Sequence, residues 1–291
     1  MSHQFLISAS DLKQCFTENN TVILDATTFI LPDSVKRYRT EPGLNSFLAG
    51  HIPGAQFVDI QADLSDQASP WRFMLPSSEA FAERIRAFGV GNASQVIVYS
   101  TGDPWWATRL WWTFHVFGHD NVLVLDGGWS AWVAAGGNVE TGSAVPRALG
   151  DYIPRFHREF VASKTDVLKA VGAGDTVVNA RSPSAFRGDS GNLYGRPGHI
   201  PGSANFPAEA LYDPKSGRML SLEAQRAALE ELSFDRPVIV HCGHGIAASA
   251  TAFALIRLGH PNVRIYDASL SEWAADESLP LQTGPDVATT T

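Results

Sequence analysis

The chain has 291 residues, of which 44% are hydrophobic and 18% charged, and its formal net charge is −8. This composition is that of a globular protein with room for two domains, and it excludes a disordered chain. The acidic balance excludes the basic surface of a nucleic-acid-binding protein, and no apolar run reaches the length of a membrane-spanning helix.

The chain contains two cysteines, Cys15 and Cys242, which are too few for a disulfide framework or for the usual ligand pairs of a zinc site. Its first residues show neither the basic and apolar regions of a secretory signal nor an arginine-rich transit peptide. We therefore expect a cytoplasmic protein with free thiols, and we expect no metal, no cofactor and no membrane or nucleic-acid partner.

The first half of the chain predicts a small α/β domain. A β-rich run at 22–24 is followed by a Gly/Pro turn at 51–54, a helix over 78–88, a strand within 95–100, a tryptophan-rich helix and a closing strand at 121–125. Short apolar strands that alternate with helices indicate a mostly parallel sheet flanked by helices on both faces.

The second half repeats this order. "AGHIPGAQF" (49–57) matches "PGHIPGSANF" (197–206), "QVIVYS" (95–100) matches "PVIVHC" (237–242), and "NVLVLDGGWSAW" (121–132) matches "NVRIYDASLSEW" (262–273). A duplicated domain explains repeats in a conserved order at nearly constant offsets. We therefore predict an N-terminal domain over 1–142, a linker over 143–158 and a C-terminal domain over 159–291.

Cys242 follows the predicted strand 238–240, and a glycine-rich turn leads from it into a helix over 249–259. Ligands of open α/β sheets bind beyond the carboxyl ends of the strands. Gly243 and Gly245 permit backbone angles that turn several N–H groups inward, and such a nest at a helix N-terminus binds anions. The same field favours the thiolate, so we predict that Cys242 is a nucleophile, whereas Cys15 is a packing residue.

The position six residues after Cys242 bears on the type of chemistry. A Cys-x5-Arg phosphatase loop places an arginine there to hold phosphate oxygens, but this chain has Ala248. The compact loop is better sized for one additional sulfur atom.

These motifs resemble those of the tandem-rhodanese sulfurtransferases, the family of thiosulfate and 3-mercaptopyruvate sulfurtransferases. "GHIPGA", "GHIPGS", "LDGGWSAW", "YDASLSEW" and the cysteine loop carry the resemblance, which covers about residues 9–283. It implies two rhodanese-like domains of which only the C-terminal one is catalytic, because Ser100 stands opposite Cys242. It also implies that Cys242 takes sulfane sulfur from thiosulfate or 3-mercaptopyruvate and passes it, as a persulfide, to cyanide, a thiol or thioredoxin.

The resemblance also assigns the substrate-binding residues. The loop amides that would hold the persulfide belong to Gly243, His244, Gly245, Ile246, Ala247 and Ala248, and "CGHG" is similar to the Cys-Gly-x-Gly of mercaptopyruvate sulfurtransferases. The segment "NARSPSAFRG" departs from the family pattern, since Asn179 replaces an aspartate and Ala185 an arginine. We predict that Arg187 and Arg196 bind the anionic group of the donor instead.

Two alternatives to turnover with a small donor stay open. The lost arginine and the histidine at 244 are also consistent with a persulfide carrier or a partner-binding rhodanese protein without turnover of its own. A cysteine phosphatase or arsenate reductase on the same fold is less favoured. Among the other polar residues, His51 and His199 are interpreted as loop-fixing residues, and His241, which alternates with Cys242 along the strand, as a structural one.

Overall fold

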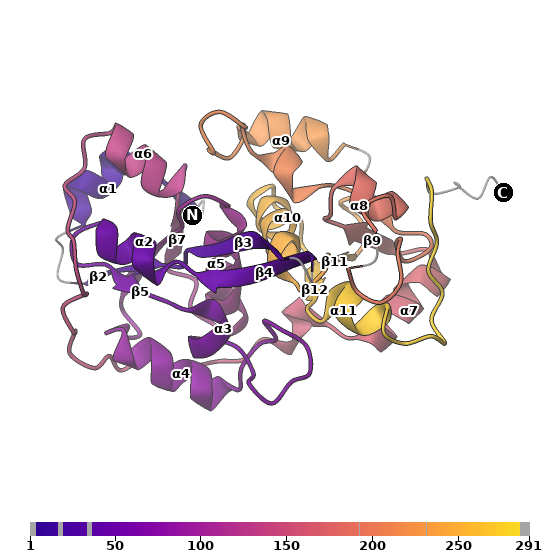
Figure 1. Ribbon diagram of the computed structural model, residues 1–291, viewed down its shortest axis with the longest axis horizontal. Coiled ribbons are helices and arrows are strands. Elements are labelled where there is room, and N and C mark those ends of the chain that lie inside the picture. Colours follow the sequence, from indigo (N-terminus) through magenta and orange to yellow (C-terminus); the bar gives the residue numbers. More distant parts are fainter. Residues whose placement is uncertain (1–3, 17–19, 34–36, 192, 231, 286–291) are drawn as a thin grey trace. The chain divides into compact units, whose positions relative to one another are not determined.

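The computed structural model of the protein describes residues 4–16, 20–33, 37–191, 193–230 and 232–285 (Figure 1). The chain packs as two compact units. The first unit comprises residues 1–68, 75–157 and 213–219, and the second comprises 69–74, 158–212 and 220–291. Each half of the sequence therefore gives one short segment, 69–74 or 213–219, to the other unit. No helix in the described ranges is long and apolar enough to cross a membrane.

The first unit is built on a five-stranded parallel sheet in the order β1-β7-β6-β2-β5. Its strands are β1 (Leu6–Ile7), β2 (Thr21–Asp25), β5 (Gln56–Phe57), β6 (Gln95–Tyr99) and β7 (Val122–Leu125). An antiparallel hairpin of β3 (Thr28–Asp33) and β4 (Arg37–Pro42), which the sequence pattern did not predict, adds a second small sheet.

Helices cover both faces of this sheet, which fits the mostly apolar, buried strands of a parallel sheet. The helices of the unit are α1 (Ala9–Cys15), α2 (Leu44–Ala49), α3 (Ile60–Asp63), α4 (Ser78–Ala87), α5 (Trp105–Val116) and α6 (Gly128–Ala134). One core cluster joins Ile23 and Ile97 of the sheet to residues of α1, α2 and α6, among them Trp132. Figure 1 shows α1 and α6 together on one side of the strands and α4 on the other.

The second unit repeats this sheet strand for strand. Its order is β8-β12-β11-β9-β10, again all parallel, with β8 (Val161–Ala162), β9 (Thr176–Asn179), β10 (Ala204–Asn205), β11 (Val238–His241) and β12 (Val263–Tyr266). Its helices are η1 (Arg158–Phe160), α7 (Lys164–Ala173), α8 (Pro183–Arg187), η2 (Ala208–Leu211), α9 (Leu222–Ala228), α10 (Ile246–Arg257) and α11 (Ser269–Trp273). The duplication and the α/β architecture predicted from the sequence are confirmed.

The predicted elements differ from the observed ones mainly at their ends. The helix predicted over 78–88 is α4, which begins after the side-chain cap of Ser77. The helix predicted over 249–259 is α10, which begins three residues earlier and ends before Gly259, whose φ is +85°. The predicted domain boundaries and the linker over 143–158 stay predictions, and residues up to 157 pack with the first unit.

Candidate active site

Cys242 lies where the central strand of the second sheet gives way to a helix. β11 ends at His241, and Gly245, with φ +76° and ψ −9°, is the N-cap of α10. Only a residue without a side chain adopts this left-handed conformation at little cost, which explains the glycine at the end of the turn. Cys242 itself is 3% exposed, so it is buried and does not lie on the open surface.

The main chain of Cys242 is held by the turn that follows β12. Its N–H donates to Oγ of Ser269 at 3.0 Å, and that hydroxyl donates in turn to the carbonyl of Tyr266 at 2.8 Å. The carbonyl of Cys242 accepts the N–H of Leu270 at 3.3 Å. The backbone of the predicted nucleophile is therefore fixed at both its N–H and its carbonyl, and its N–H points to Ser269.

Ser269 adopts a backbone conformation that few residues other than glycine adopt. Its φ is +54°, and the equivalent residue of the first unit, 141 positions earlier, is Gly128 with the same φ of +54°. The left-handed region costs a residue with a Cβ about 1–2 kcal/mol. In the second unit, the strained residue is the serine whose hydroxyl accepts the N–H of Cys242. Backbone strain of this kind is typical of functional positions.

The start of α10 supplies an electrostatic field for a sulfur anion. The first N–H groups of an α-helix, here those of Ile246, Ala247 and Ala248, have no partner within the helix, and the helix dipole adds partial positive charge. The hydroxyl of Ser249 donates to the carbonyl of Gly245 at 2.8 Å and so fixes the first turn. Such a helix start favours an anion bound beside it, and a sulfur anion at Cys242 stays the prediction.

Two aromatic rings enclose His244, the residue at the tip of the loop. Its imidazole packs edge-on against Phe73, with 6.1 Å between ring centroids, and against Tyr194, with 5.1 Å. Burial, aided by the positive charges of Arg72 and Arg181, lowers the pKa of His244 to about 4. The histidine side chain is therefore neutral near pH 7.

Tyr194 also explains why residue 243 is a glycine. A Cβ placed on Gly243 would lie 1.9 Å from the hydroxyl oxygen of Tyr194, which is far inside van der Waals contact. The side chain of Tyr194 therefore packs directly against Gly243, the residue that follows the cysteine.

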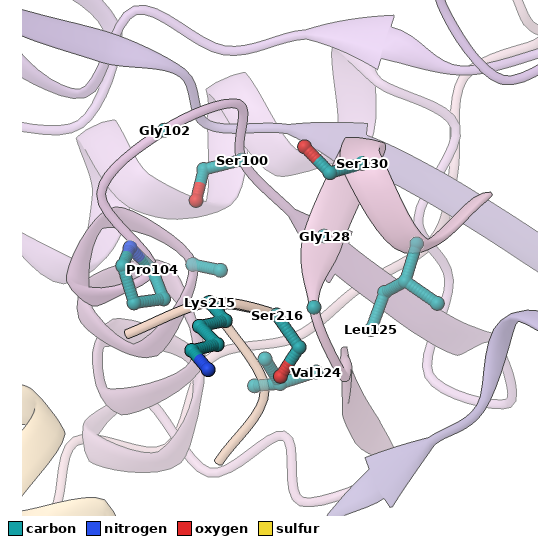
Figure 2. Close-up of a pocket in the computed structure, with 12 residues that line it drawn as sticks. Ser100, Gly102, Pro104, Val124, Leu125, Gly128, Ser130, Lys215 and Ser216 are labelled. Carbon is teal, nitrogen blue, oxygen red and sulfur yellow. The ribbon is translucent and has the colours of Figure 1, made fainter. Parts of the chain in front are cut away.

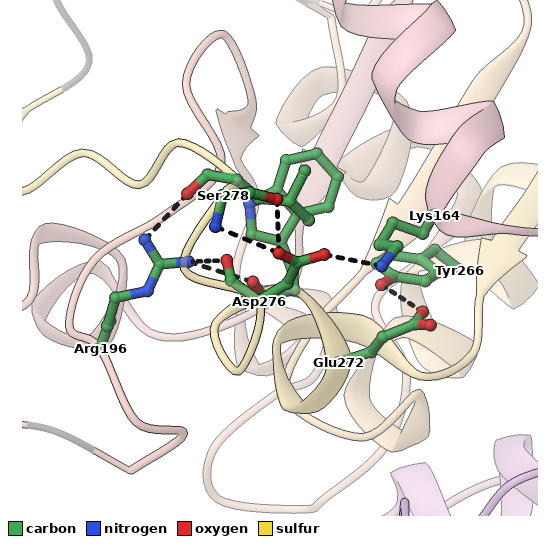
Figure 3. A network of polar contacts seen from close by, with 8 residues as sticks. Lys164, Arg196, Tyr266, Glu272, Asp276 and Ser278 are labelled. Atoms are coloured by element: carbon green, nitrogen blue, oxygen red, sulfur yellow. Dashed lines mark hydrogen bonds and ion pairs between the residues drawn. The ribbon is translucent and has the colours of Figure 1, made fainter.

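The two arginines predicted to bind the donor have other partners in the structure. Arg196 donates through Nε, Nη1 and Nη2 to the carbonyls of Ala274, Leu279, Trp273 and Asp276, which occupies four of its five N–H donors. Figure 3 shows this guanidinium beside the segment that carries Asp276, whose carboxylate pairs with Nζ of Lys164 at 2.8 Å. Arg187, at the end of α8, pairs with Asp189 at 2.8 Å. A donor-binding role for either arginine stays a prediction.

The histidines interpreted as structural are buried and fixed. His51 and His199 are fully buried, stack on Phe47 and Phe186 at centroid distances of 3.8 and 3.6 Å, and place Nδ1 within 2.9 Å of the carbonyl of the same phenylalanine. This equivalent geometry in both units supports a loop-fixing role. His241 is completely buried as well, and burial lowers its pKa to about 3.

The first unit has a pocket where the second has its cysteine. Ser100 follows β6 as Cys242 follows β11, and its hydroxyl donates to the carbonyl of Asp103 at 2.9 Å. The pocket has a volume of about 140 Å³, and Figure 2 shows Ser100 and Ser130 in it beside the segment that carries Lys215 and Ser216. A serine at this position lacks the thiolate chemistry of a cysteine.

Comparison with known proteins agrees with this geometry. The model of the rhodanese-like domain matches residues 8–135 and 163–276, which is most of both halves. The chain belongs to the rhodanese family. Its two rhodanese domains correspond to the two units of the fold, and the expected tandem arrangement is confirmed.

Several relatives of this rhodanese protein are named for their activity. The 3-mercaptopyruvate sulfurtransferase of Escherichia coli strain K12 is 38% identical over 241 residues, which are 81% of this chain and 84% of the relative. The mitochondrial thiosulfate/3-mercaptopyruvate sulfurtransferase 1 of Arabidopsis thaliana is 31% identical and covers 95% of this chain and 78% of its own. The crystal structure of the 3-mercaptopyruvate sulfotransferase SseA from Escherichia coli superposes with a TM-score of 0.81 at 33% identity, covering 91% of this chain and 98% of the other.

Proposed function

We propose that this protein is a sulfurtransferase that moves a sulfane sulfur from thiosulfate or 3-mercaptopyruvate, through a persulfide on Cys242, to a thiol such as thioredoxin or to cyanide. The observation that carries the proposal is the place of Cys242 between the end of β11 and the N-terminus of α10. Relatives named for sulfur transfer at 31–38% identity support the same reaction class. No cofactor is required.

The reaction divides into two displacements at sulfur. The Cys242 thiolate attacks the outer sulfur of the donor and forms an S–S bond. With thiosulfate the old S–S bond breaks and sulfite leaves with its electron pair, and with 3-mercaptopyruvate the C–S bond breaks and pyruvate leaves as its enolate, which takes up a proton. The acceptor thiolate or cyanide then attacks the outer sulfur of the persulfide, and Cys242 leaves as the thiolate.

The loop amides from Gly243 to Ala248 are the electrostatic part of this mechanism. The negative charge lies on the cysteine sulfur before the attack and on the outer sulfur of the persulfide afterwards, so donors that converge on the loop stabilise both states. We place the reaction in the cytoplasm, where a free thiol persists, because the sequence carries only two cysteines.

Mass spectrometry of the intact protein tests the proposal. Incubation with thiosulfate or 3-mercaptopyruvate should add one sulfur atom to the wild-type chain and to a Cys15→Ser variant, and none to Cys242→Ser. Cyanide or a reduced dithiol should then remove it and form product in repeated turnovers. No adduct with either donor, or an adduct that persists in Cys242→Ser, would refute the mechanism, and an adduct without turnover would favour the persulfide carrier.

A further inference from the structure

Two arginine–aromatic pairs converge on the tip of the cysteine loop. The guanidinium carbon of Arg72 lies 4.9 Å from the ring centroid of Phe73, and that of Arg181 lies 5.2 Å from the ring centroid of Tyr194. Both rings pack edge-on against the imidazole of His244. All five residues belong to the second unit, because segment 69–74 packs there.

Packing and hydrogen bonds hold these residues in defined conformations. Phe73 is 2% exposed and has a φ of +62°, a strained value for a residue with a Cβ, so the segment is held in place by the packing of this ring. The adjacent Arg72 is exposed and thus reaches solvent beside the loop. On the other side, Nη1 of Arg181 donates to the carbonyl of Gly198 at 3.3 Å, and its backbone N–H donates to Asn179 at 3.0 Å.

The charges of both arginines are felt at His244. Each of them lowers the pKa of the imidazole in addition to burial. The tip of the loop therefore carries a neutral ring, two residues away from Cys242, that lies within the field of two cations. A positive field of this kind draws an anion toward the nucleophile.

The positive charge that the family resemblance leads us to expect near Cys242 is either missing from this chain or already paired with other groups. Ala185 stands where the family has an arginine, and its methyl group is buried in the second unit. Four of the five donors of Arg196 bind main-chain carbonyls, and Arg187 pairs with a carboxylate.

We propose that Arg72 and Arg181, through the aromatic rings that contact His244, form the subsite for the oxyanion group of the sulfur donor. The inference rests on the proposed sulfurtransferase function. Both proposed donors, thiosulfate and 3-mercaptopyruvate, carry an anionic sulfonate or carboxylate group close to the transferred sulfur. Guanidinium groups suit both, since each presents paired N–H donors to two oxygens of the same group. The arginine at 72 comes from the N-terminal half of the sequence, so both halves of the chain contribute to one site.

Binding of unreactive anions tests the subsite separately from turnover. Pyruvate represents the carboxylate donor and sulfate the sulfonate donor, and Cys242→Ser removes the nucleophile. Isothermal titration calorimetry of the Cys242→Ser variant should show saturable binding of at least one of the two anions. The anion that binds more tightly identifies the type of donor. Adding Arg72→Gln or Arg181→Gln should weaken that binding about 10- to 100-fold, the effect of losing a charged hydrogen-bond donor.

Matched variants control for charge and folding. Arg39→Gln removes another exposed arginine, from β4 of the first unit, and should change binding by less than about twofold. Arg181→Lys keeps the charge and should lose less affinity than Arg181→Gln, with melting temperatures measured for each variant. In the wild-type background, Arg72→Gln should raise KM for the anionic donor while kcat changes much less.

Two results would overturn the proposal. One is the absence of saturable binding of either anion to Cys242→Ser. The other is unchanged binding in both Arg72→Gln and Arg181→Gln, above all if Arg187→Gln or Arg196→Gln weakens it. Retained, arginine-dependent binding in a protein that forms no persulfide would instead refute the proposed function and leave the subsite in place.

Discussion

The hydroxyl of Ser271 lies 2.6 Å from Nδ1 of His244 and 2.6 Å from the carbonyl oxygen of Gly243. A carbonyl only accepts, so the single hydroxyl proton of Ser271 goes to Gly243. The imidazole must then donate from Nδ1 to the serine oxygen. Because His244 is neutral near pH 7, its lone pair lies on Nε2, and Ser271 thereby fixes both the tautomer of the ring and the peptide unit after Cys242.

We predict that Ser271→Ala releases this tautomer. The imidazole nitrogens of the wild-type protein should show a protonated Nδ1 and an unprotonated Nε2 in ¹⁵N NMR at pH 7, and the variant should show a mixture or the reverse. The free energy of unfolding should fall by about 1–2 kcal/mol, because the imidazole of His244 loses its acceptor and the carbonyl of Gly243 keeps only the backbone N–H of Ser271 as a donor. An unprotonated Nδ1 in the wild-type spectrum would contradict the assignment, and Ser278→Ala, at an exposed turn, is the control.

The depressed pKa values of His241 and His244 predict loss of stability in mild acid. Their folded-state values, about 3 and about 4, lie below the ordinary value of 6.5, so the unfolded chain takes up protons first as the pH falls. This contribution to stability is complete above pH 6.5 and is lost toward pH 4 and 3, by up to about 1.4 kcal/mol per pH unit for each histidine. Urea denaturation between pH 7.5 and 5 measures the slope.

A variant distinguishes the histidines from the carboxylates. Asp276, whose pKa is lowered to about 2 by Lys164, keeps its stabilising effect until far below pH 5. The pKa values of His119 and His260 are lowered by burial as well. His241→Tyr, which introduces the residue found at the equivalent position 99, should therefore remove part of the slope between pH 6.5 and 5. An unchanged slope would show that His241 does not carry it.

Asn179 and His241 face each other on neighbouring strands, as Asp25 and Tyr99 do in the first unit. Tyr99 hydrogen-bonds to Asp25, whose pKa is raised by burial. We predict that Asn179→Asp destabilises the protein by about 1–3 kcal/mol, because it buries a carboxyl without that phenol. Asn179→Asp combined with His241→Tyr should recover most of the loss, and additive effects in the double-mutant cycle would contradict the pairing.

The repeats in the sequence were enough to predict the two α/β domains, the strand before Cys242 and the helix after it. These features could be predicted because an apolar strand or a glycine turn can be recognised from about ten consecutive residues. They did not predict that segment 69–74 packs with the second unit, since no short pattern encodes a contact with residue 244. Arg72 and Tyr194 were missed for that reason.

One missed residue did leave a signal in the sequence. In the alignment of the two halves, Ser269 stands opposite Gly128, and both have a left-handed backbone. A serine at a position that favours glycine indicates that its hydroxyl has a structural or functional role. The arginines were the weakest prediction, because the partners of a long side chain depend on tertiary packing. The four carbonyls around Arg196 come from residues 273–279, 77 to 83 positions away.

Substitution of Ser269 separates its strain from its hydrogen bonds. Ser269→Ala keeps the Cβ at φ +54° but removes the acceptor of the Cys242 N–H, whereas Ser269→Gly removes the acceptor and relieves the strain. We expect Ala to lower the free energy of unfolding by about 1–3 kcal/mol, and Gly by about 1 kcal/mol less, since an unpaired buried N–H costs about the former and the left-handed region about the latter.

Activity should follow a different order from stability. Both variants free the amide of Cys242, so both should slow persulfide formation in single-turnover experiments, by about tenfold if the hydrogen bond contributes about 1.4 kcal/mol to positioning. Ser269→Thr, which keeps the hydroxyl, should retain more of the rate than either, and it should be less stable because a β-branched residue suits a positive φ poorly. If Ser269→Ala forms persulfide as fast as the wild-type protein, the bond from Cys242 to Ser269 has no part in positioning the nucleophile, because the lost stability alone would not change a single-turnover rate in the folded protein.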